Sequence, residues 1–244
     1  MVFDAIVRAR MSYIILIVAF VLSFGAARYA IGRFEGAMQR GRRWHVPEDK
    51  TGADIAAEFL AANEAGDVQI VRHNAVVSDY FDPGRRRLFL RAETHDGKDL
   101  ASWALALHEA AHALQNGDDL NSLKWRRTCI SLTRYAPVGA GLMLFVVFLL
   151  RRLPGKMAVL AFLGVCGAVL LMNMGSLAIE FNANARVLKW LEERLSRYPG
   201  AIEKLQQLLG PIATRELGDL FNSPRYFFLS ALPGTGGSRP TKKD

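Results

Sequence analysis

Cysteine and histidine are scarce in this sequence. Its 244 residues include two cysteines, Cys129 and Cys166, and five histidines. So few cysteines exclude a disulfide-rich secreted scaffold and a zinc finger built on cysteine ligands. The low apolar content of a disordered chain is also absent, because 51% of the residues are apolar. Both cysteines lie in or beside apolar segments, where we expect them to be buried structural residues.

Acidic residues are in the minority. The chain carries 31 lysines and arginines against 23 aspartates and glutamates, a formal net charge of +8. A basic balance favours contact with nucleic acid, anionic lipid or acidic partners. No nucleic-acid recognition motif accompanies the basic segment at residues 40–43, so we expect no nucleic-acid partner. That segment suits the anionic headgroups of a lipid bilayer instead.

The apolar residues are concentrated in three runs without charge. The runs cover Met11–Ala27, Tyr135–Leu150 and Met157–Ile179, which are 17, 16 and 23 residues long. A membrane-spanning helix needs about 20 apolar residues. The third run meets this length fully, and the first two approach it, with Arg28 and Arg134 able to snorkel from their ends. The sequence therefore predicts about three transmembrane helices in a multi-pass integral membrane protein.

Short segments between and before the runs refine this topology. The segment Arg151–Lys156 (RRLPGK) is a tight turn, so runs two and three should form a helical hairpin. Arg8 and Arg10 before the first run are also compatible with a cleaved signal peptide. We favour an uncleaved anchor, because the apolar region continues to Ile31 without a clear A-x-A cleavage site.

The predicted elements divide the chain into five parts. These are a membrane anchor (1–31), a soluble part (32–134), a transmembrane hairpin (135–179), a helical part (180–232) and a disordered tail (233–244). Capping and periodicity predict helices over 51–63, 99–115, 180–198, 201–209 and 217–232, and strands over 68–71, 75–78 and 87–91. The expected fold class is α+β, mainly α, with a small β-sheet.

The helix over 99–115 carries the pattern H-E-x-x-H, from His108 through Glu109 to His112. Positions i and i+4 share one helix face about 6 Å apart, so both imidazoles can reach one zinc ion. Glu109 lies beside the metal and can take a proton from a zinc-bound water. The alternative is a pair of core histidines, which is less favourable because buried titratable groups without partners are costly.

A hydrolytic zinc site needs a third protein ligand. The remaining histidines, at positions 45, 73 and 95, lie in turns or strands upstream. Glu180 directly follows the third apolar run and shares a helix face with Asn184. From the residues alone, Glu180 is either an inward-facing ligand or a membrane-boundary glutamate exposed to headgroups.

Five segments in order resemble the family of neutral zinc metallopeptidases anchored in bacterial membranes (the YugP-type group). They are TGADIAAEFLAAN (51–63), SDYFDPGRRRLFL (78–90), LALHEAAHALQ (105–115), RYAPVGAG (134–141) and IEFNANAR (179–186). The resemblance implies a zincin-like fold in a bacterial inner or plasma membrane. It implies zinc bound by His108, His112 and Glu180, with Glu109 as general base and Asn184 as hydrogen-bond partner of a metal histidine.

The chain departs from the family pattern at three points. Ala111 replaces the usual glycine, and Asn184 replaces a serine or aspartate. The C-terminal third matches poorly, which leaves the donor for the developing oxyanion unassigned. On chemistry alone, Arg225 and Tyr226 are candidates for that donor. The alternative is an ordinary membrane-proximal arginine and a packed tyrosine.

The reading from sequence is a membrane-embedded zinc endopeptidase, in which zinc-activated water attacks a peptide carbonyl. We expect peptide or protein substrates, membrane-proximal ones in particular, bound along an edge strand at Arg87–Arg91. An edge merely protected by charge is the alternative for that strand. The alternative function is a non-catalytic membrane scaffold or adaptor with a structural or vestigial zinc site. A soluble helical protein with apolar core helices is a further alternative.

Membrane orientation rests on flanking charge. Five lysines and arginines flank the predicted spans on the side of the N-terminus, against 13 on the side of the soluble part. The positive-inside tendency then places the zinc site in the cytoplasm. The short turn RRLPGK is itself dense in positive charge and argues for the opposite orientation.

Overall fold

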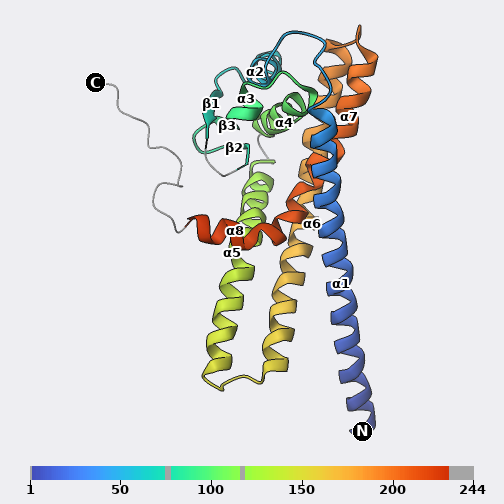
Figure 1. Ribbon diagram of the computed structural model, residues 1–244, viewed down its shortest axis with the longest axis vertical. Coiled ribbons are helices and arrows are strands. Elements are labelled where there is room, and N and C mark those ends of the chain that lie inside the picture. The colour runs from blue at the N-terminus through green and yellow to red at the C-terminus, as the bar shows by residue number, and fades with distance from the viewer. Residues whose placement is uncertain (1, 75–77, 116–118, 231–244) are drawn as a thin grey trace, which may run out of the picture.

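The computed structural model describes residues 2–74, 78–115 and 119–230. Three long helices run side by side, and a head of short helices and a small sheet sits at one end of them (Figure 1). The N-terminus lies at the far end, away from the head. The predicted tail at 233–244 lies outside the described residues.

The long helices are α1 (Val2–Gly41), α5 (Asp119–Leu149) and α6 (Gly155–Arg194). The third apolar run (157–179) and most of the helix predicted over 180–198 are one continuous helix, α6. Nothing between Met157 and Arg194 breaks it. Among the described residues, α5 from Asn121 and α6 are long and apolar enough to span a membrane. A third span, which would lie in α1, stays a prediction.

The second and third apolar runs lie in α5 and α6, two helices that form a hairpin. α5 and α6 lie against each other and are joined by the segment around Arg151 and Pro154. Below the head, large apolar side chains of α5 and α6 point outward, among them Met143, Phe145 and Val159. Such exposure on two adjacent helices suits a lipid environment and is unusual in water.

The sheet contains β1 (Gln69–His73), β2 (Tyr80–Asp82) and β3 (Arg87–Arg91) in the order β1-β3-β2. β3 pairs parallel with β1 and antiparallel with β2. The prediction that residues 87–91 form an edge strand is therefore wrong, because β3 is central. Its alternating residues Leu88 and Leu90 are fully buried, as a central strand over a core requires.

The strand predicted over 75–78 lies mostly outside the described residues. No strand was predicted over β2, and among the described strands β2 forms one edge of the sheet. The turn after it begins where Asp82 Oδ1 accepts a hydrogen bond from the Gly84 amide at 2.9 Å. A short side-chain-to-backbone bond of this kind explains the Asp-Pro-Gly sequence without a metal.

The helices of the head begin as the sequence predicts. In α2 (Gly52–Ala62), Thr51 and Asp54 form a capping box. Asp99 caps α4 (Leu100–Ala111) by accepting from the Ser102 amide at 2.9 Å. The last turn of the predicted helix tightens into the 3-10 helix η1 (His112–Leu114). A short helix, α3 (Ala92–His95), follows β3 and was not predicted.

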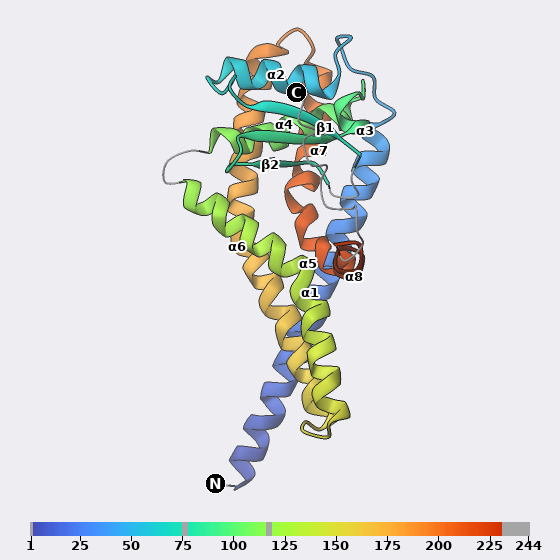
Figure 2. The ribbon, with the colours of Figure 1, turned by 90° about the vertical axis from the view of Figure 1, so that its left-hand side faces the viewer.

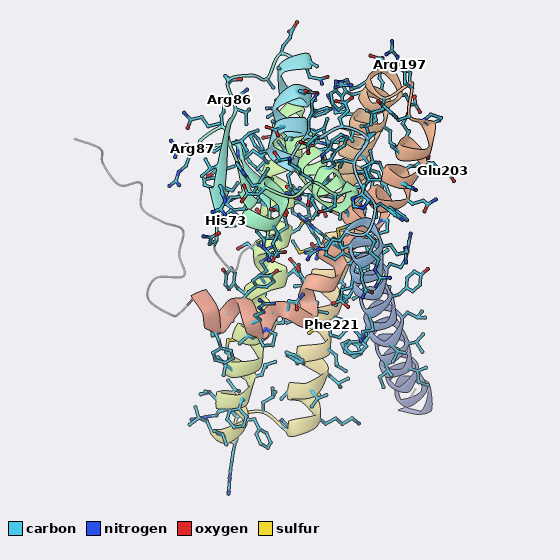
Figure 3. All side chains as sticks on the ribbon, turned by 45° about the horizontal axis from the view of Figure 1, so that its top comes forward. His73, Arg86, Arg87, Arg197, Glu203 and Phe221 are labelled. Atoms are coloured by element: carbon cyan, nitrogen blue, oxygen red, sulfur yellow. The ribbon has the colours of Figure 1, made fainter. Side chains whose placement is uncertain are left out.

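α4 is the centre of the head. It packs between α2, α6 and α7 (Pro199–Thr214), and nearly every residue of α4 is buried. Figure 2 shows the sheet with α4 behind it and the long helices descending below. Charged side chains such as Arg86, Arg197 and Glu203 lie on the outside of this head (Figure 3).

The C-terminal segment returns to the long helices. After η2 (Arg215–Gly218), α8 (Asp219–Ser230) packs against α5 and lies across it in Figure 1, and it is seen end-on in Figure 2. Figure 3 shows Phe221 where α8 meets the bundle, and Phe221 packs against the apolar cluster of Cys166 and Leu170. Cys129 and Cys166 are both buried, as expected.

Candidate metal centre

His108 and Glu109 lie in the last turns of α4, and His112 begins η1. The three side chains are 0–1% exposed. The helix is apolar on nearly all sides, and with its neighbours α2, α6 and α7 packed against it every residue except Leu105 is buried. Polar side chains therefore enter the interior of the head, where each must find a partner.

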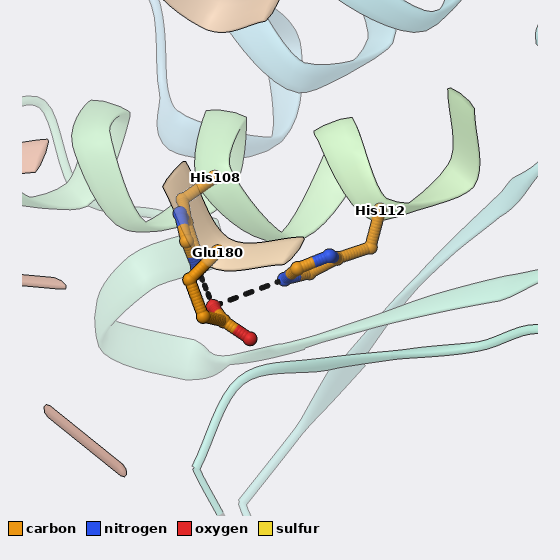
Figure 4. A group of neighbouring side chains, drawn as sticks. All are labelled: His108, His112 and Glu180. Atoms are coloured by element: carbon orange, nitrogen blue, oxygen red, sulfur yellow. Dashed lines mark hydrogen bonds and ion pairs between the residues drawn. The ribbon is translucent and has the colours of Figure 1, made fainter. Parts of the chain in front are cut away.

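Glu180 comes from the middle of α6 and is 1% exposed. Its Oε2 atom lies 3.0 Å from His108 Nε2 and 3.5 Å from His112 Nε2 (Figure 4). The potential ligand atoms of the three residues all lie within 4.8 Å of one another. The alternative of a glutamate exposed to headgroups is therefore wrong.

Two amides fix the orientation of the imidazoles. His108 Nδ1 lies 2.8 Å from Asn184 Oδ1, and the Asn184 amide nitrogen donates to the Leu209 carbonyl at 2.7 Å. His112 Nδ1 lies 2.9 Å from Gln115 Oε1, and the Gln115 nitrogen donates to the Ile179 carbonyl at 2.9 Å. Because both amide oxygens can only accept, each Nδ1 carries the proton. Both Nε2 atoms then present lone pairs to Glu180.

This donor set fits a cation. Two imidazole lone pairs and a carboxylate oxygen converge in a buried space, which is unfavourable unless something positive lies between them. His112 Nε2 is buried without a hydrogen-bond partner in the described part of the chain. Burial and the nearby charge of Arg126 lower the pKa of His112, so its imidazole is neutral, the form that binds metal.

Glu109 follows His108 on α4 and contacts an arginine. Its Oε1 accepts a hydrogen bond from Arg215 Nη2, while Oε2 is buried and has no partner among the described residues. Burial opposes ionisation of this carboxyl group, but the charges of Arg215 and Arg126 outweigh burial and lower its pKa. Glu109 is therefore an ionised carboxylate with one free oxygen beside the two histidines.

A comparison with known protein families shows to which family the chain belongs. The model of the family described as "Putative neutral zinc metallopeptidase" matches residues 12–214, most of the chain. The chain belongs to this zinc metallopeptidase family. It is also similar to a protein of Bacillus subtilis (strain 168) named "Putative membrane protease YugP". The two are 26% identical over 168 residues, which cover 68% of this chain and 72% of that protein. No solved structure matches the chain, so a zincin-like fold stays a prediction.

The sequence reasoning missed two buried arginines beside the triad of His108, His112 and Glu180. Arg126 donates to Glu180 Oε1 and, at 2.7 Å, to Glu216 Oε1. Arg215 donates to Glu109 and, at 3.4 Å, to the carbonyl of Asp79. Arg126 precedes the second apolar run and was counted as a membrane-flanking charge. Nothing in the local sequence around Arg215 indicates that it reaches Glu109, which lies 106 positions earlier.

The other candidates lie away from the triad of His108, His112 and Glu180. Arg225 and Tyr226 on α8 line a separate cavity of about 670 Å³ between α1, α8 and the sheet. Tyr226 lies under the guanidinium of Arg134, 4.5 Å from the ring centre. No contact between either residue and the triad is found among the described residues. Arg215 lines the same cavity and contacts Glu109, so it is better placed than either.

The upstream histidines make other contacts. His45 forms an isolated bridge with Asp99, and the ring of His95 lies 2.7 Å from Asp96. His73 lies on β1, among the aromatic rings of Tyr80 and Phe89. In the described chain, no group of potential metal ligands includes any of the three.

Proposed function

We propose that this chain is a membrane-associated, zinc-dependent endopeptidase. His108, His112 and Glu180 would hold the zinc ion, and Glu109 would act as general base. The observation that carries this proposal is the convergence of three buried donors, with both histidine tautomers set by amide oxygens, directly beside a free carboxylate oxygen. The family's zinc and peptidase description supports the same reading.

Each residue of the site would have its own role in the reaction. A zinc ion with three protein ligands acts as a Lewis acid that lowers the pKa of a coordinated water and polarises a carbonyl. Glu109 Oε2 would accept the proton of the attacking water and deliver it to the leaving amine. Arg215 would hold Oε1, which keeps Glu109 ionised and oriented. Asn184 and Gln115 would keep both Nε2 atoms unprotonated.

Access to the triad favours catalysis over a structural site. His112 lines a cavity of about 350 Å³ between β2 and α5, here called the His112 cavity. A structural zinc site is closed by four ligands, whereas a catalytic site keeps one position open. The group of potential ligands in the described chain contains three residues. A scaffold with a purely structural zinc would need neither the cavity nor the free oxygen of Glu109.

The position of Glu180 suggests where the protein would bind its substrates relative to the bilayer. α6 contains both the apolar run Met157–Ile179 and Glu180, so the site would lie where this helix leaves the bilayer. Membrane-proximal segments are the proposed substrates, and the multi-pass chain would place the site in the cytoplasm. Labelling of a cysteine placed at Lys156, in a chain with Cys129 and Cys166 changed to serine, tests the orientation. Reaction with an impermeant reagent from the outside would support it, and reaction from the cytoplasmic side alone would contradict it.

The decisive experiment measures metal and cleavage together. The chain is purified in detergent with the variants Glu109→Gln, Glu180→Ala and, as a control on the exposed face of α6, Glu193→Gln. Wild type and the control should hold about one zinc ion and cleave casein. Glu109→Gln should keep the zinc and lose cleavage, and Glu180→Ala should lose both. Equal zinc in all four proteins with no cleavage would contradict the assignment.

A further inference from the structure

The walls of the His112 cavity are unusually rich in arginine. β2 and the following turn form one wall, with Tyr80, Asp82 and Pro83, and α5 forms the other. Arg126, Arg127 and Arg134 all reach the cavity from α5, against the single carboxylate of Asp82. Because His112 shares this cavity, whatever enters it lies beside the proposed metal centre.

The three arginines differ in how well their charge is balanced. Arg126 is paired with Glu180 and Glu216, and Arg134 with Asp219 at 3.0 Å. Arg127 is exposed and has no ion-pair partner among the residues that the structure describes. Asp82 lines the same cavity without an ion pair to Arg127, and its Oδ1 accepts from the Gly84 amide.

A guanidinium without a partner in a cavity is suited to a carboxylate, which it can bind through two parallel hydrogen bonds. Apolar side chains complete the lining, among them Phe81, Leu123 and Ile130. They provide a surface for the short aliphatic stem of an acidic residue. A lysine side chain would place a second positive charge beside Arg127 and is disfavoured.

The sheet supplies a route by which a peptide would reach this cavity. β2 is the edge strand next to the cavity, since no other described strand pairs with its free side. An extended peptide that pairs with β2 presents alternate side chains to the same side. One of these side chains would lie over the His112 cavity while the main chain passes the triad.

We propose that the His112 cavity receives a carboxylate of the substrate and that Arg127 pairs with it. The carboxylate comes from an Asp or Glu side chain beside the scissile bond, or from a free C-terminus. The inference rests on the proposed peptidase function only for the position of the scissile bond. It makes Arg127 a specificity-determining residue that the metal centre itself does not need.

Binding is measured without cleavage, in the full-length zinc-loaded Glu109→Gln protein in detergent. Fluorescence anisotropy follows labelled, C-terminally amidated peptides that differ only in a central Glu, Gln or Lys. A fourth peptide has the central Gln and a free C-terminus. The peptide with Glu, the one with the free C-terminus, or both should bind at least about tenfold more tightly than the amidated Gln peptide. Which of the two prevails identifies the source of the carboxylate.

The variant Arg127→Glu should abolish this preference and favour the Lys peptide, and Arg127→Gln should remove it without reversal. Lys124→Glu is the matched control, because Lys124 lies one turn earlier on α5, is exposed and does not line the cavity. The control should keep the preference for the carboxylate. Thermal midpoints of all variants check that each protein is folded.

Several results would overturn the proposal. These are equal binding of all four peptides, no binding of any peptide, or a preference that persists in Arg127→Glu. Displacement of the bound peptide by micelles containing phosphatidylglycerol, but not by phosphatidylcholine, would assign the cavity to lipid headgroups instead. If the preference depends on Arg127 while wild type cleaves none of the peptides, the binding site stands and the proposed catalytic function fails.

Discussion

Asn184 gives the sharpest test of how the candidate metal centre is held. Its side chain makes two buried hydrogen bonds, from His108 Nδ1 to Oδ1 at 2.8 Å and from Nδ2 to the Leu209 carbonyl at 2.7 Å. Asn184→Ala removes both. Loss of the first frees the His108 ring to rotate or change tautomer, and loss of such a partner typically lowers metal affinity about 10- to 100-fold. That range corresponds to about 1.4–2.7 kcal/mol.

Loss of the second bond has a different consequence. The Leu209 carbonyl is left buried and unpaired, which costs about 1–3 kcal/mol of folding stability. Asn184→Asp separates the two effects, because it keeps an acceptor for His108 and replaces the donor to Leu209 with a carboxylate oxygen, which cannot donate. We expect Asn184→Asp to retain zinc affinity to within a few-fold and to unfold at a lower temperature than wild type. Competition with a zinc chelator in detergent measures the affinity. Unchanged affinity in Asn184→Ala would refute the role assigned to this residue.

Two further predictions concern stability, read from thermal unfolding midpoints in detergent. Arg215→Met leaves the carboxylate of Glu109 buried without its partner, a loss of about 3–5 kcal/mol. Adding Glu109→Gln to Arg215→Met should raise the unfolding midpoint part of the way back to the wild-type value. If the effects of the two substitutions on stability simply add, Arg215 and Glu109 are not coupled. Gly52→Ala should destabilise the head, because its Cβ would overlap the Thr94 carbonyl, whereas Gly32→Ala in α1 meets nothing within 4 Å and should stabilise by about 0.5–1 kcal/mol.

The local parts of this structure follow directly from the sequence. The capping box at Thr51 and the aspartate cap of α4 both rely on hydrogen bonds within three residues, so short-range patterns predict them. The H-E-x-x-H spacing is likewise a property of a single helix. Placement of Glu180 needed the family resemblance, because its role depends on α6 packing against α4 across 72 positions.

Long-range pairing could not be read from the sequence. β3 carries an arginine at each end and resembles a protected edge strand, yet it is central because Leu88 and Leu90 anchor it over the core. Arg126 resembles an ordinary membrane-flanking cation, yet its head group lies between Glu180 and Glu216. A charged residue is expected to be exposed to solvent unless the sequence shows a partner for it. The two partners of Arg126 lie 54 and 90 positions away in the chain.

The charges around Glu180 lead to a prediction about metal uptake. The described interior of the head contains the carboxylates Asp79, Glu109, Glu180 and Glu216, and the guanidiniums of Arg126 and Arg215 that pair with three of them. Burial, together with the negative charge of Glu180, raises the pKa of Glu216 to about 8 despite Arg126. Near pH 7, Glu216 therefore holds a proton, and the cluster has a net charge near −1.

A divalent cation at the triad changes that balance. It brings the net charge to about +1 and neutralises the repulsion that Glu180 exerts on Glu216, so the pKa of Glu216 falls and its proton is released. At pH 7, zinc uptake should therefore release up to one proton from Glu216, since the histidine Nε2 atoms already lack one. Calorimetry in buffers of different ionisation enthalpy counts the protons. Glu216→Gln should lower the count at pH 7, and the difference from wild type should vanish above about pH 9, where Glu216 is ionised before metal arrives. An identical proton count in both proteins at pH 7 would contradict this coupling.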